Sequence, residues 1–299
     1  MPRLTAHDFD QELLNLFDAY VHGNIDRRGF LEGAGKFAVG GWTAAGLLAA
    51  LSPNFAAAQV VPKDDARIKA EMINYPSPSG SGSVKALLAR PAAATGRLPS
   101  VVVVHEARGL NPHIEDIARR LAVDGFLALA PDGLSPQGGY PGDEDKARDM
   151  FAKADRAKML EDFVAAAQFL KGHALGNGKV GATGFCFGGG MVHLLTLRLP
   201  DLAAGVPFYG DLPSPAEAAK VKTPLQLHFA GEDPRINNAW PAYEVALKAA
   251  SANYTAFNYA GTQHGFNNDT TPRFDANAAK LAWQRTVEFF GQHLRAGWA

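Results

Sequence analysis

Short apolar runs recur along the chain from residue 60 onward and predict strands that are buried inside a sheet. Residues 100–105 contain four consecutive valines, and residues 126–130 form the next apolar run. Strands buried on both faces of a parallel sheet have this composition. The segment between them opens with Asn111-Pro112 and repeats apolar positions every three or four residues, which predicts an amphipathic helix. The order strand, helix, strand predicts a β-α-β unit with a right-handed crossover.

The same alternation continues to the C-terminus. Apolar runs predict further strands at residues 180–183, 205–209, 225–230 and 254–259. Amphipathic stretches predict a long helix or helix pair at residues 144–171, a helix after residue 186 and a last helix that carries Leu281, Val287, Phe290 and Leu294. Residues 60–92 predict two strands around a turn rich in Pro, Ser and Gly. This pattern predicts an α/β fold whose mostly parallel sheet is covered by helices on both faces.

Composition narrows the class of protein. The chain has 299 residues, a formal net charge of -1 and a single cysteine. This length suits one sizeable domain, and the near-neutral charge gives no reason to expect a nucleic-acid partner. One cysteine cannot form an internal disulfide or a cysteine-based metal cluster, so the thiol is either structural or reactive. No apolar run is long enough for a convincing permanent membrane span.

Residues 1–58 differ in composition from residues 59–299 and resemble a targeting segment. Arg27-Arg28 is a twin arginine, residues 37–51 are weakly apolar and rich in Gly and Ala, and Ala56-Ala57-Ala58 offers a cleavage site. These features predict export of the folded protein to the periplasm by a twin-arginine route. The alternative is that the segment forms helices that pack on the domain or bridge subunits of a homo-oligomer, in a protein that stays in the cytoplasm.

The most informative stretch is Gly184-Phe185-Cys186-Phe187-Gly188, which follows a short predicted strand and precedes a helix. It has the G-x-nucleophile-x-G form of a strand-to-helix elbow, with cysteine in place of serine. Glycines two residues to either side of the nucleophile are needed because side chains there would collide with the neighbouring backbone. A helix N-terminus would also lower the pKa of the Cys186 thiol. The alternative is an ordinary buried cysteine in a Gly-rich turn.

The residues after the elbow favour the catalytic interpretation. Asp233 follows the strand at residues 225–230, and His264 lies in a loop between the last strand and the last helix. Nucleophile, acid and histidine in this order are typical of one class of hydrolase triads. His264 is predicted to be the general base, and Asp233 to hold the other imidazole nitrogen. Glu232 competes for the role of the acid.

The loop after the valine strand, His105-Glu106-Ala107-Arg108-Gly109, is placed to supply half of an oxyanion hole. The backbone N–H groups of Ala107 and Phe187 are predicted to bind the developing oxyanion, at about 3 kcal/mol per donor. Glu106 is expected near the thiol, where a buried carboxylate needs a partner. A salt bridge between Glu106 and Arg108 is the alternative.

The elbow, this loop and the Asp233/His264 pair together resemble the dienelactone hydrolase family, from roughly residue 60 to the C-terminus. The resemblance implies an α/β-hydrolase fold and hydrolysis of a small ester or lactone such as carboxymethylenebutenolide. It implies that Cys186 is the nucleophile, that Asp233 and His264 complete the triad, and that Glu106 contacts the thiol and helps to deprotonate it when substrate binds. We expect no cofactor and no metal.

Two positions depart from the family's pattern. Where the best-known members have an arginine that binds the substrate carboxylate, four residues beyond the histidine, this chain has Asn268. The second substrate arginine of these members lies in the region before the nucleophile strand. No residue of this chain matches it securely, since Arg148 and Arg156 lie only near that position. Arg108 and Arg235 are predicted to supply an anion site from other loops.

These observations predict an enzyme that cleaves a small carboxylic ester or lactone through a thioacyl-enzyme intermediate. One alternative is a redox-responsive protein whose thiol forms a sulfenic acid. The other is a non-catalytic binding protein with residues 1–58 as its docking arm. Neither alternative explains His264 and Asp233 at triad positions.

Overall fold

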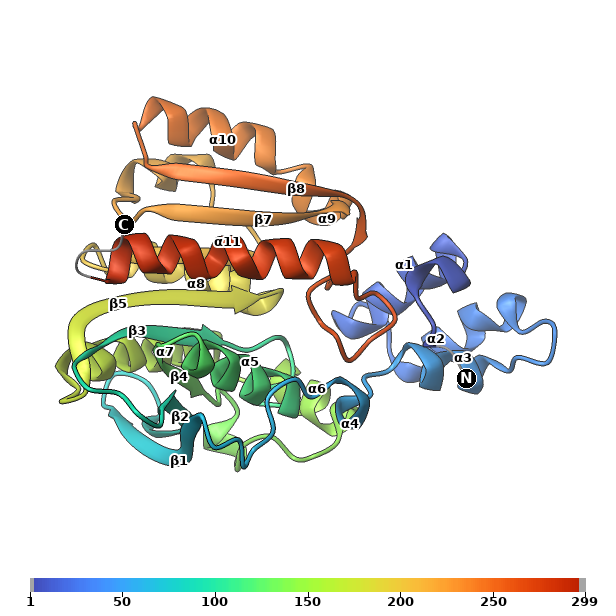
Figure 1. Ribbon diagram of the computed structural model, residues 1–299. Coiled ribbons are helices and arrows are strands. Elements are labelled where there is room, and N and C mark those ends of the chain that lie inside the picture. The colour runs from blue at the N-terminus through green and yellow to red at the C-terminus, as the bar shows by residue number, and fades with distance from the viewer. Residues whose placement is uncertain (1–2, 296–299) are drawn as a thin grey trace.

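The computed structural model describes residues 3–295, and within this range the strands form one eight-stranded sheet in the order β1-β2-β4-β3-β5-β6-β7-β8 (Figure 1). The first two strands form an antiparallel hairpin, β2 pairs antiparallel with β4, and the pairs from β4 to β8 are parallel. The predicted hairpin, β-α-β unit and mostly parallel sheet are confirmed. The strands are β1 (Ile68–Ser77), β2 (Gly82–Pro91), β3 (Leu98–Val104), β4 (Leu127–Pro131), β5 (Gly176–Phe185), β6 (Ala204–Phe208), β7 (Leu225–Glu232) and β8 (Tyr254–Gln263).

Helices cover both faces of this sheet. One face packs against α5 (Pro112–Val123) and α11 (Ala276–Leu294), and the other against α7 (Arg156–Gly172) and α8 (Phe187–Arg198). The helix predicted at residues 144–171 is a pair, made of α6 (Glu144–Ala152) and α7. The shorter elements are η3 (Ser135–Gln137), α6 (Glu144–Ala152), η4 (Pro215–Lys220), α9 (Pro234–Asn237) and α10 (Trp240–Ala249).

The four valines of β3 show why the strand is apolar at every position. Val101 and Val103 belong to the core on the α5 and α11 side, whereas Val102 and Val104 belong to the core on the α7 side. All four side chains are fully buried. Successive side chains of a strand point to opposite faces, so a strand covered on both sides needs an uninterrupted apolar run.

Cys186 occupies a strained turn between β5 and α8. Its φ of 55° and ψ of -117° lie outside the regions that residues with a side chain normally adopt. A Cβ on Gly184 would lie 2.3 Å from the carbonyl oxygen of Gly188, and a Cβ on Gly188 would lie 2.3 Å from that of Val104. The elbow geometry predicted from the two glycines is therefore confirmed.

Replacing Gly188 with alanine is expected to lower the free energy of unfolding by about 3 kcal/mol, because the new methyl group meets backbone atoms that cannot move aside. Urea or thermal unfolding measures the effect. Gly172→Ala is the matched control, since nothing lies within 4 Å of a Cβ at that position. Equal stability of the two variants would show that the elbow tolerates a side chain at residue 188.

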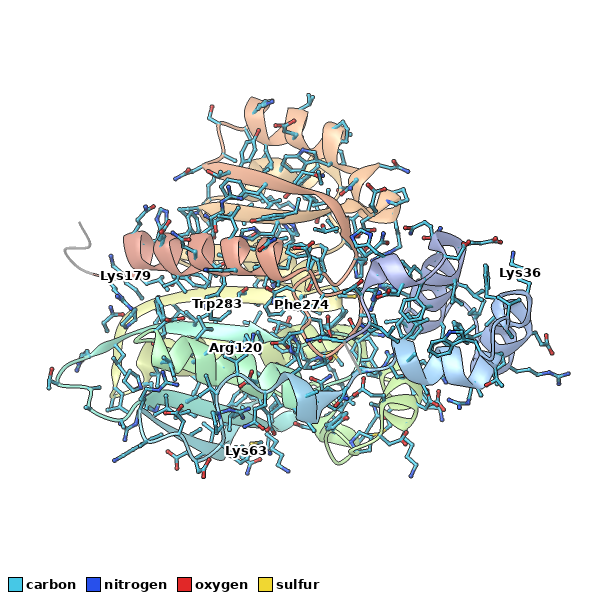
Figure 2. All side chains as sticks on the ribbon, turned by 45° about the vertical axis from the view of Figure 1, so that its right-hand side comes forward. Lys36, Lys63, Arg120, Lys179, Phe274 and Trp283 are labelled. Atoms are coloured by element: carbon cyan, nitrogen blue, oxygen red, sulfur yellow. The ribbon has the colours of Figure 1, made fainter. Side chains whose placement is uncertain are left out.

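Residues 3–58 form a helical arm beside the carboxyl ends of the parallel strands (Figure 1). The arm has its own apolar core, in which Phe17, Phe30 and Leu51 are fully or almost fully buried. Lys36 lies on its outer side, away from Trp283 of α11 (Figure 2). Its elements are η1 (Ala6–Asp8), α1 (Gln11–Val21), α2 (Arg27–Ala34), η2 (Gly35–Phe37), α3 (Ala44–Leu51) and α4 (Phe55–Ala58).

Polar contacts join the arm to the α/β unit. Arg27 of the twin arginine forms an ion pair with Asp145 at 2.8 Å, whereas Arg28 pairs with Glu32 within α2. The backbone N–H of Asn54 donates to the carbonyl oxygen of Thr270 at 2.8 Å. Among the described residues, no helix is long and apolar enough to cross a membrane. Export to the periplasm and removal of residues 1–58 stay predictions, which N-terminal sequencing of protein from a periplasmic fraction tests.

Candidate active site

The Asp233/His264 pair lies beside Cys186 at the carboxyl ends of β5, β7 and β8. His264 lies in the loop that follows β8, and its Nδ1 is 2.6 Å from Oδ2 of Asp233. Both side chains are buried. Glu232, the competing acid, is exposed and pairs with Gln263 in the sheet. The structure thus brings Asp233 rather than Glu232 to the imidazole, where a carboxylate fixes the tautomer with Nε2 toward the thiol.

Nε2 of His264 is the nitrogen that would exchange a proton with the thiol. Within residues 3–295 it is buried and makes no direct hydrogen bond. Donor atoms of His264, Cys186 and His22 all lie within 4.8 Å of one another. The nitrogen is therefore free to move a proton to or from the sulfur or a molecule bound beside it.

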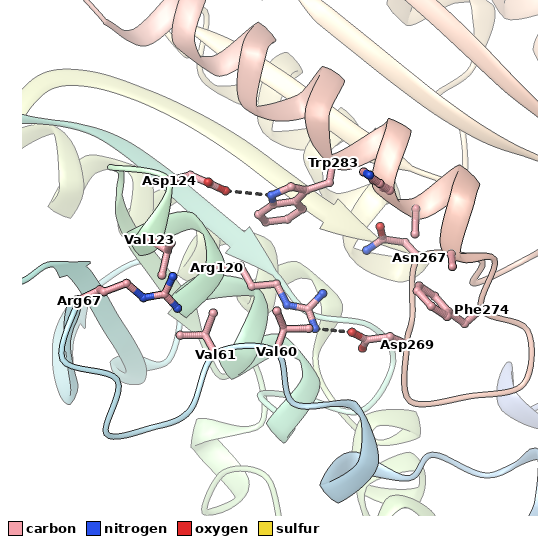
Figure 3. Close-up of a pocket in the computed structure, with 13 residues that line it drawn as sticks. Val60, Val61, Arg67, Arg120, Val123, Asp124, Asn267, Asp269, Phe274 and Trp283 are labelled. Carbon is pink, nitrogen blue, oxygen red and sulfur yellow. Dashed lines mark hydrogen bonds and ion pairs between the residues drawn. The ribbon is translucent and has the colours of Figure 1, made fainter. Parts of the chain in front are cut away.

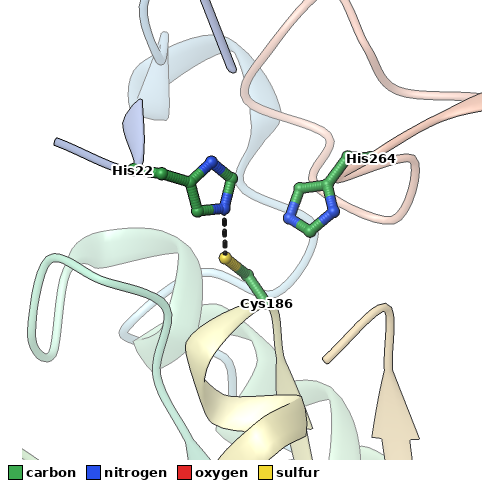
Figure 4. Close-up of side chains that lie close together, drawn as sticks. All are labelled: His22, Cys186 and His264. Atoms are coloured by element: carbon green, nitrogen blue, oxygen red, sulfur yellow. Dashed lines mark hydrogen bonds between the residues drawn. The ribbon is translucent and has the colours of Figure 1, made fainter. Parts of the chain in front are cut away.

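His22 is a member of the site that the sequence analysis missed. It follows α1 directly, and its Nε2 lies 3.2 Å from Sγ of Cys186 (Figure 4). Its ring centroid is 5.0 Å from that of His264, at an interplanar angle of 71°. The thiol therefore lies beside two histidines that are far apart in the sequence.

These charges govern the ionisation of the thiol. Burial raises the pKa of Cys186, but the positive charges of His22 and His264 outweigh it and lower the pKa to about 6. Burial likewise disfavours the imidazolium of His22, yet the Cys186 thiolate and Asp18 raise its pKa to about 10. For His264, the thiolate and Asp233 raise the pKa to about 9 against the effect of burial. A thiolate paired with imidazolium is thus favoured near neutral pH.

Glu106 contacts Asn268, which was anticipated neither by the predicted contact of Glu106 with the thiol nor by the alternative salt bridge to Arg108. The side-chain amide of Asn268 donates to Oε2 of Glu106 at 2.8 Å, and Oδ1 of Asn268 accepts from the backbone N–H of Thr270 at 3.1 Å. Asn268 occupies the position where the family has a substrate arginine, and here it orients the carboxylate of Glu106 instead. The alternative salt bridge from Glu106 to Arg108 is not the observed contact, because Arg108 lies 3.8 Å from Glu144 and donates to the carbonyl oxygen of Val21.

A cavity of about 360 Å³ opens beside the thiol. Ala107 and Phe187, whose N–H groups are predicted to bind the oxyanion, line it together with Cys186. Four arginines also line it. Arg108 and Arg235 are the two predicted to bind an anion, and Arg148 and Arg156 are the two that lie near the family's second substrate arginine in the sequence. The cavity is therefore rich in positive charge.

The environments of these arginines differ. Arg235 forms an ion pair with Asp211 at 2.7 Å, and its Nη2 lies 3.2 Å from Nε2 of His22. The guanidinium of Arg156 lies 3.5 Å from the centroid of the Phe151 ring. Among the described residues, no carboxylate forms an ion pair with Arg156, and burial lowers its pKa. Arg156 is thus a partly desolvated cation at the cavity wall.

A second cavity, of about 420 Å³, lies between α5, α11 and the loop at residues 267–274 (Figure 3). Its wall combines apolar side chains such as Trp283 and Phe274 with the paired charges of Arg120 and Asp269. It shares no lining residue with the cavity beside Cys186. Of the catalytic candidates, Cys186 lines the cavity of about 360 Å³, and it also lines a narrower pocket of about 60 Å³ together with His264 and Glu106.

The His22, Cys186 and His264 trio has donor atoms close enough together for a metal ion to bridge them. However, the guanidinium of Arg235 lies 3.2 Å from the ring nitrogen of His22 that would bind the ion. A positive charge at this distance opposes a cation. The same guanidinium opposes a proton on Nε2 of His22, but the Asp18 carboxylate 3.2 Å from Nδ1 and the thiolate 3.2 Å from Nε2 favour that proton, so we interpret the trio as an ion pair between thiolate and imidazolium.

Comparison with known proteins identifies the family. The model of the dienelactone hydrolase family matches residues 84–294, and a model described as YqhI-like matches residues 1–38. A "Putative carboxymethylenebutenolidase" of Escherichia coli (strain K12) is 33% identical over 231 residues, covering 72% of this chain and 85% of that protein. A "Putative hydrolase fragment YghX" from the same strain is 55% identical over 113 residues, covering 38% of this chain and 97% of the fragment.

A solved structure agrees with these relatives. The crystal structure of a "Putative Dienelactone Hydrolase" from Klebsiella pneumoniae superposes with a TM-score of 0.68 at 31% identity, covering 75% of this chain and 99% of that chain. The eight-stranded sheet with helices on both faces is thus the α/β-hydrolase fold. The chain belongs to the dienelactone hydrolase family and is a hydrolase.

Proposed function

We propose that this protein hydrolyses a small carboxylic ester or lactone through a Cys186–His264–Asp233 triad. The observation that carries the proposal is the Asp233–His264 contact of 2.6 Å next to a cysteine on a strained elbow. An imidazole oriented by a buried carboxylate and placed near a nucleophile is the arrangement that acyl transfer requires. The names of the relatives, carboxymethylenebutenolidase and dienelactone hydrolase, agree with this reaction class.

The reaction has two steps. The thiolate of Cys186 attacks the carbonyl carbon, and the resulting oxyanion accepts hydrogen bonds from the N–H groups of Phe187 and Ala107. The C–O bond to the leaving group then breaks, the leaving oxygen takes a proton from His264, and a thioester remains on the sulfur. In the second step, His264 takes a proton from water, the water oxygen attacks the thioester, and the carboxylic acid is released as the thiolate returns.

The cavity supports a small, negatively charged substrate. Its volume of about 360 Å³ lies at the lower end of the range for small-molecule sites, and arginines form a large part of its wall. Arg108 and Arg235 are the proposed carboxylate-binding residues, with Arg156 as a third cation without a carboxylate partner among the described residues. A carboxylate-bearing ester or lactone would therefore be held with its carbonyl group near the sulfur.

Mixing the protein with p-nitrophenyl acetate and quenching within the burst is expected to give an acetyl group on Cys186, the single cysteine of the chain. Mass spectrometry of the peptide that contains Cys186 locates the group, and stopped-flow absorbance records the burst and the later turnover. Turnover without a cysteine-bound acyl group would contradict the thioacyl mechanism. A thiol that forms a sulfenic acid with peroxide but never acylates would instead support the redox alternative.

A further inference from the structure

We infer that His22, held by Asp18, is a second catalytic histidine that pairs with the Cys186 thiolate, and that the arm of residues 3–58 is a functional part of the active site. The inference rests on the proposed function in one respect, since it takes Cys186 as the nucleophile. It assigns different roles to the two histidines. His22 holds the charge of the thiolate, which leaves His264 to move protons to the leaving group and from water.

The contact with the sulfur is direct. Nε2 of His22 lies 3.2 Å from Sγ of Cys186, within hydrogen-bond reach of a sulfur. Nδ1 of the same ring lies 2.8 Å from the carbonyl oxygen of Asp18 and 3.2 Å from its carboxylate. Each ring nitrogen therefore has an anionic group within reach, which favours the doubly protonated imidazole although Nη2 of Arg235 also lies 3.2 Å from Nε2.

The place of His22 in its helix adds to this effect. His22 is the C-cap residue of α1, where the carbonyl groups of the last turn are directed toward it. The C-terminal end of a helix carries partial negative charge and stabilises a protonated histidine. The imidazolium of His22 is thus favoured by its own helix as well as by Asp18 and the thiolate.

The dyad is anchored to the α/β unit by two buried arginines. Nη1 of Arg273 donates to Oδ1 of Asp18 at 3.1 Å, and Nη2 of Arg108 donates to the carbonyl oxygen of Val21 at 3.1 Å. Arg273 follows His264 in the same loop, and Arg108 belongs to the predicted oxyanion loop. The residues that shape the active site therefore also hold His22 in position.

The arm forms a wall of the substrate cavity and leaves the cavity open. Val21, His22 and Gly23 line it together with Phe187 and Arg156. A segment that only blocked the site would fill this space. The rings of His22 and His264 instead both lie beside the sulfur of Cys186 (Figure 4), and His22 borders the open cavity.

The test measures the pH dependence of Cys186 alkylation by iodoacetamide in the full chain, with intact mass confirming that residues 1–58 are present. The thiolate reacts and the thiol does not, so the wild-type rate should fall as the pH drops through about 6. Charged and titratable groups around the pair are Asp18, Glu106, Arg108, Tyr209, Asp233, Arg235, His264 and Arg273.

In His22→Ala the midpoint is expected to move upward by about one unit, so that the alkylation rate near pH 6 falls about fivefold. His22→Gln, which keeps a polar side chain against the sulfur and the arm in place, should give the same shift because the charge is lost. His7→Ala is the matched control, since His7 is an exposed histidine of the same arm. The control should keep the wild-type midpoint.

Three outcomes would overturn the inference. The first is an unchanged midpoint in both His22 variants, and the second is faster alkylation of both variants at every pH, which would make the arm a shield. The third is protein that has lost residues 1–58 and keeps the low midpoint. Alkylation requires no ester turnover, so the two proposals can fail separately. A shifted midpoint in the His22 variants together with a wild-type esterase rate in Cys186→Ala would overturn the proposed function. The inferred pair of the Cys186 thiolate and His22 would still stand.

Discussion

Replacing Cys186 with alanine is expected to lower kcat/KM for p-nitrophenyl acetate by about 10⁴-fold or more, the scale of loss when the nucleophile of a triad is removed. The buried Cys186 side chain is small, so its replacement by alanine removes little apolar contact. The strained φ of 55° is a property of the backbone and is the same for alanine. We therefore expect the variant to fold with a melting temperature close to that of the wild type. Activity assays and circular dichroism of the same preparation separate loss of chemistry from loss of fold.

The matching control retains a weaker nucleophile. Cys186→Ser keeps an oxygen at the elbow, and we expect a small residual esterase rate, because a hydroxyl is not ionised at neutral pH and depends on His264 for activation. Equal rates in wild type and Cys186→Ala would contradict the mechanism and move the reaction away from the sulfur. The substrate cavity would then need another nucleophile.

The elbow could be predicted because its requirements are local. Gly184 and Gly188 flank Cys186 within five residues, and the physical reason for each glycine, a backbone oxygen 2.3 Å from a Cβ, acts over this short stretch. The valine strand could be predicted for a similar reason, since burial on both faces requires a continuous apolar run. Patterns that are complete within one element are thus readable without the fold.

His22 could not be predicted in the same way. Its contact with Cys186 joins residues 164 positions apart, and no periodic pattern links the two. The segment that carries His22 also resembles a targeting leader, and a leader is not expected to supply residues to an active site. A weak signal was present, because Asp18 and His22 are spaced to meet on one face of a helix.

The role of Asn268 was hidden for a related reason. The sequence revealed that an arginine of the family is missing, but only the fold shows that the amide contacts Glu106 at 2.8 Å. The same holds for Arg148 and Arg156, which line the cavity although the sequence placed them only near the family's second substrate arginine. Contacts between loops depend on how the sheet brings strand ends together, which apolar patterns do not encode.

Asp233→Asn is expected to lower kcat/KM by about 10³- to 10⁴-fold, because an amide N–H facing Nδ1 turns His264 to the wrong tautomer. Glu232→Gln is the matched control. It neutralises the adjacent, exposed carboxylate, and we expect its rate to stay within about twofold of the wild type, as for most surface changes away from a site. A normal rate in Asp233→Asn with a large loss in Glu232→Gln would move the acid to Glu232.

The same variant separates the roles of the two histidines. If His22 stabilises the thiolate, Asp233→Asn should still be alkylated by iodoacetamide near neutral pH, since the Asp18–His22 pair is untouched. Ester turnover should nevertheless fail, because His22 points its Nε2 at the sulfur and cannot protonate the leaving group in place of His264. Joint loss of alkylation and turnover would instead mean that His264 alone controls the thiol, which would leave the arm without a catalytic role.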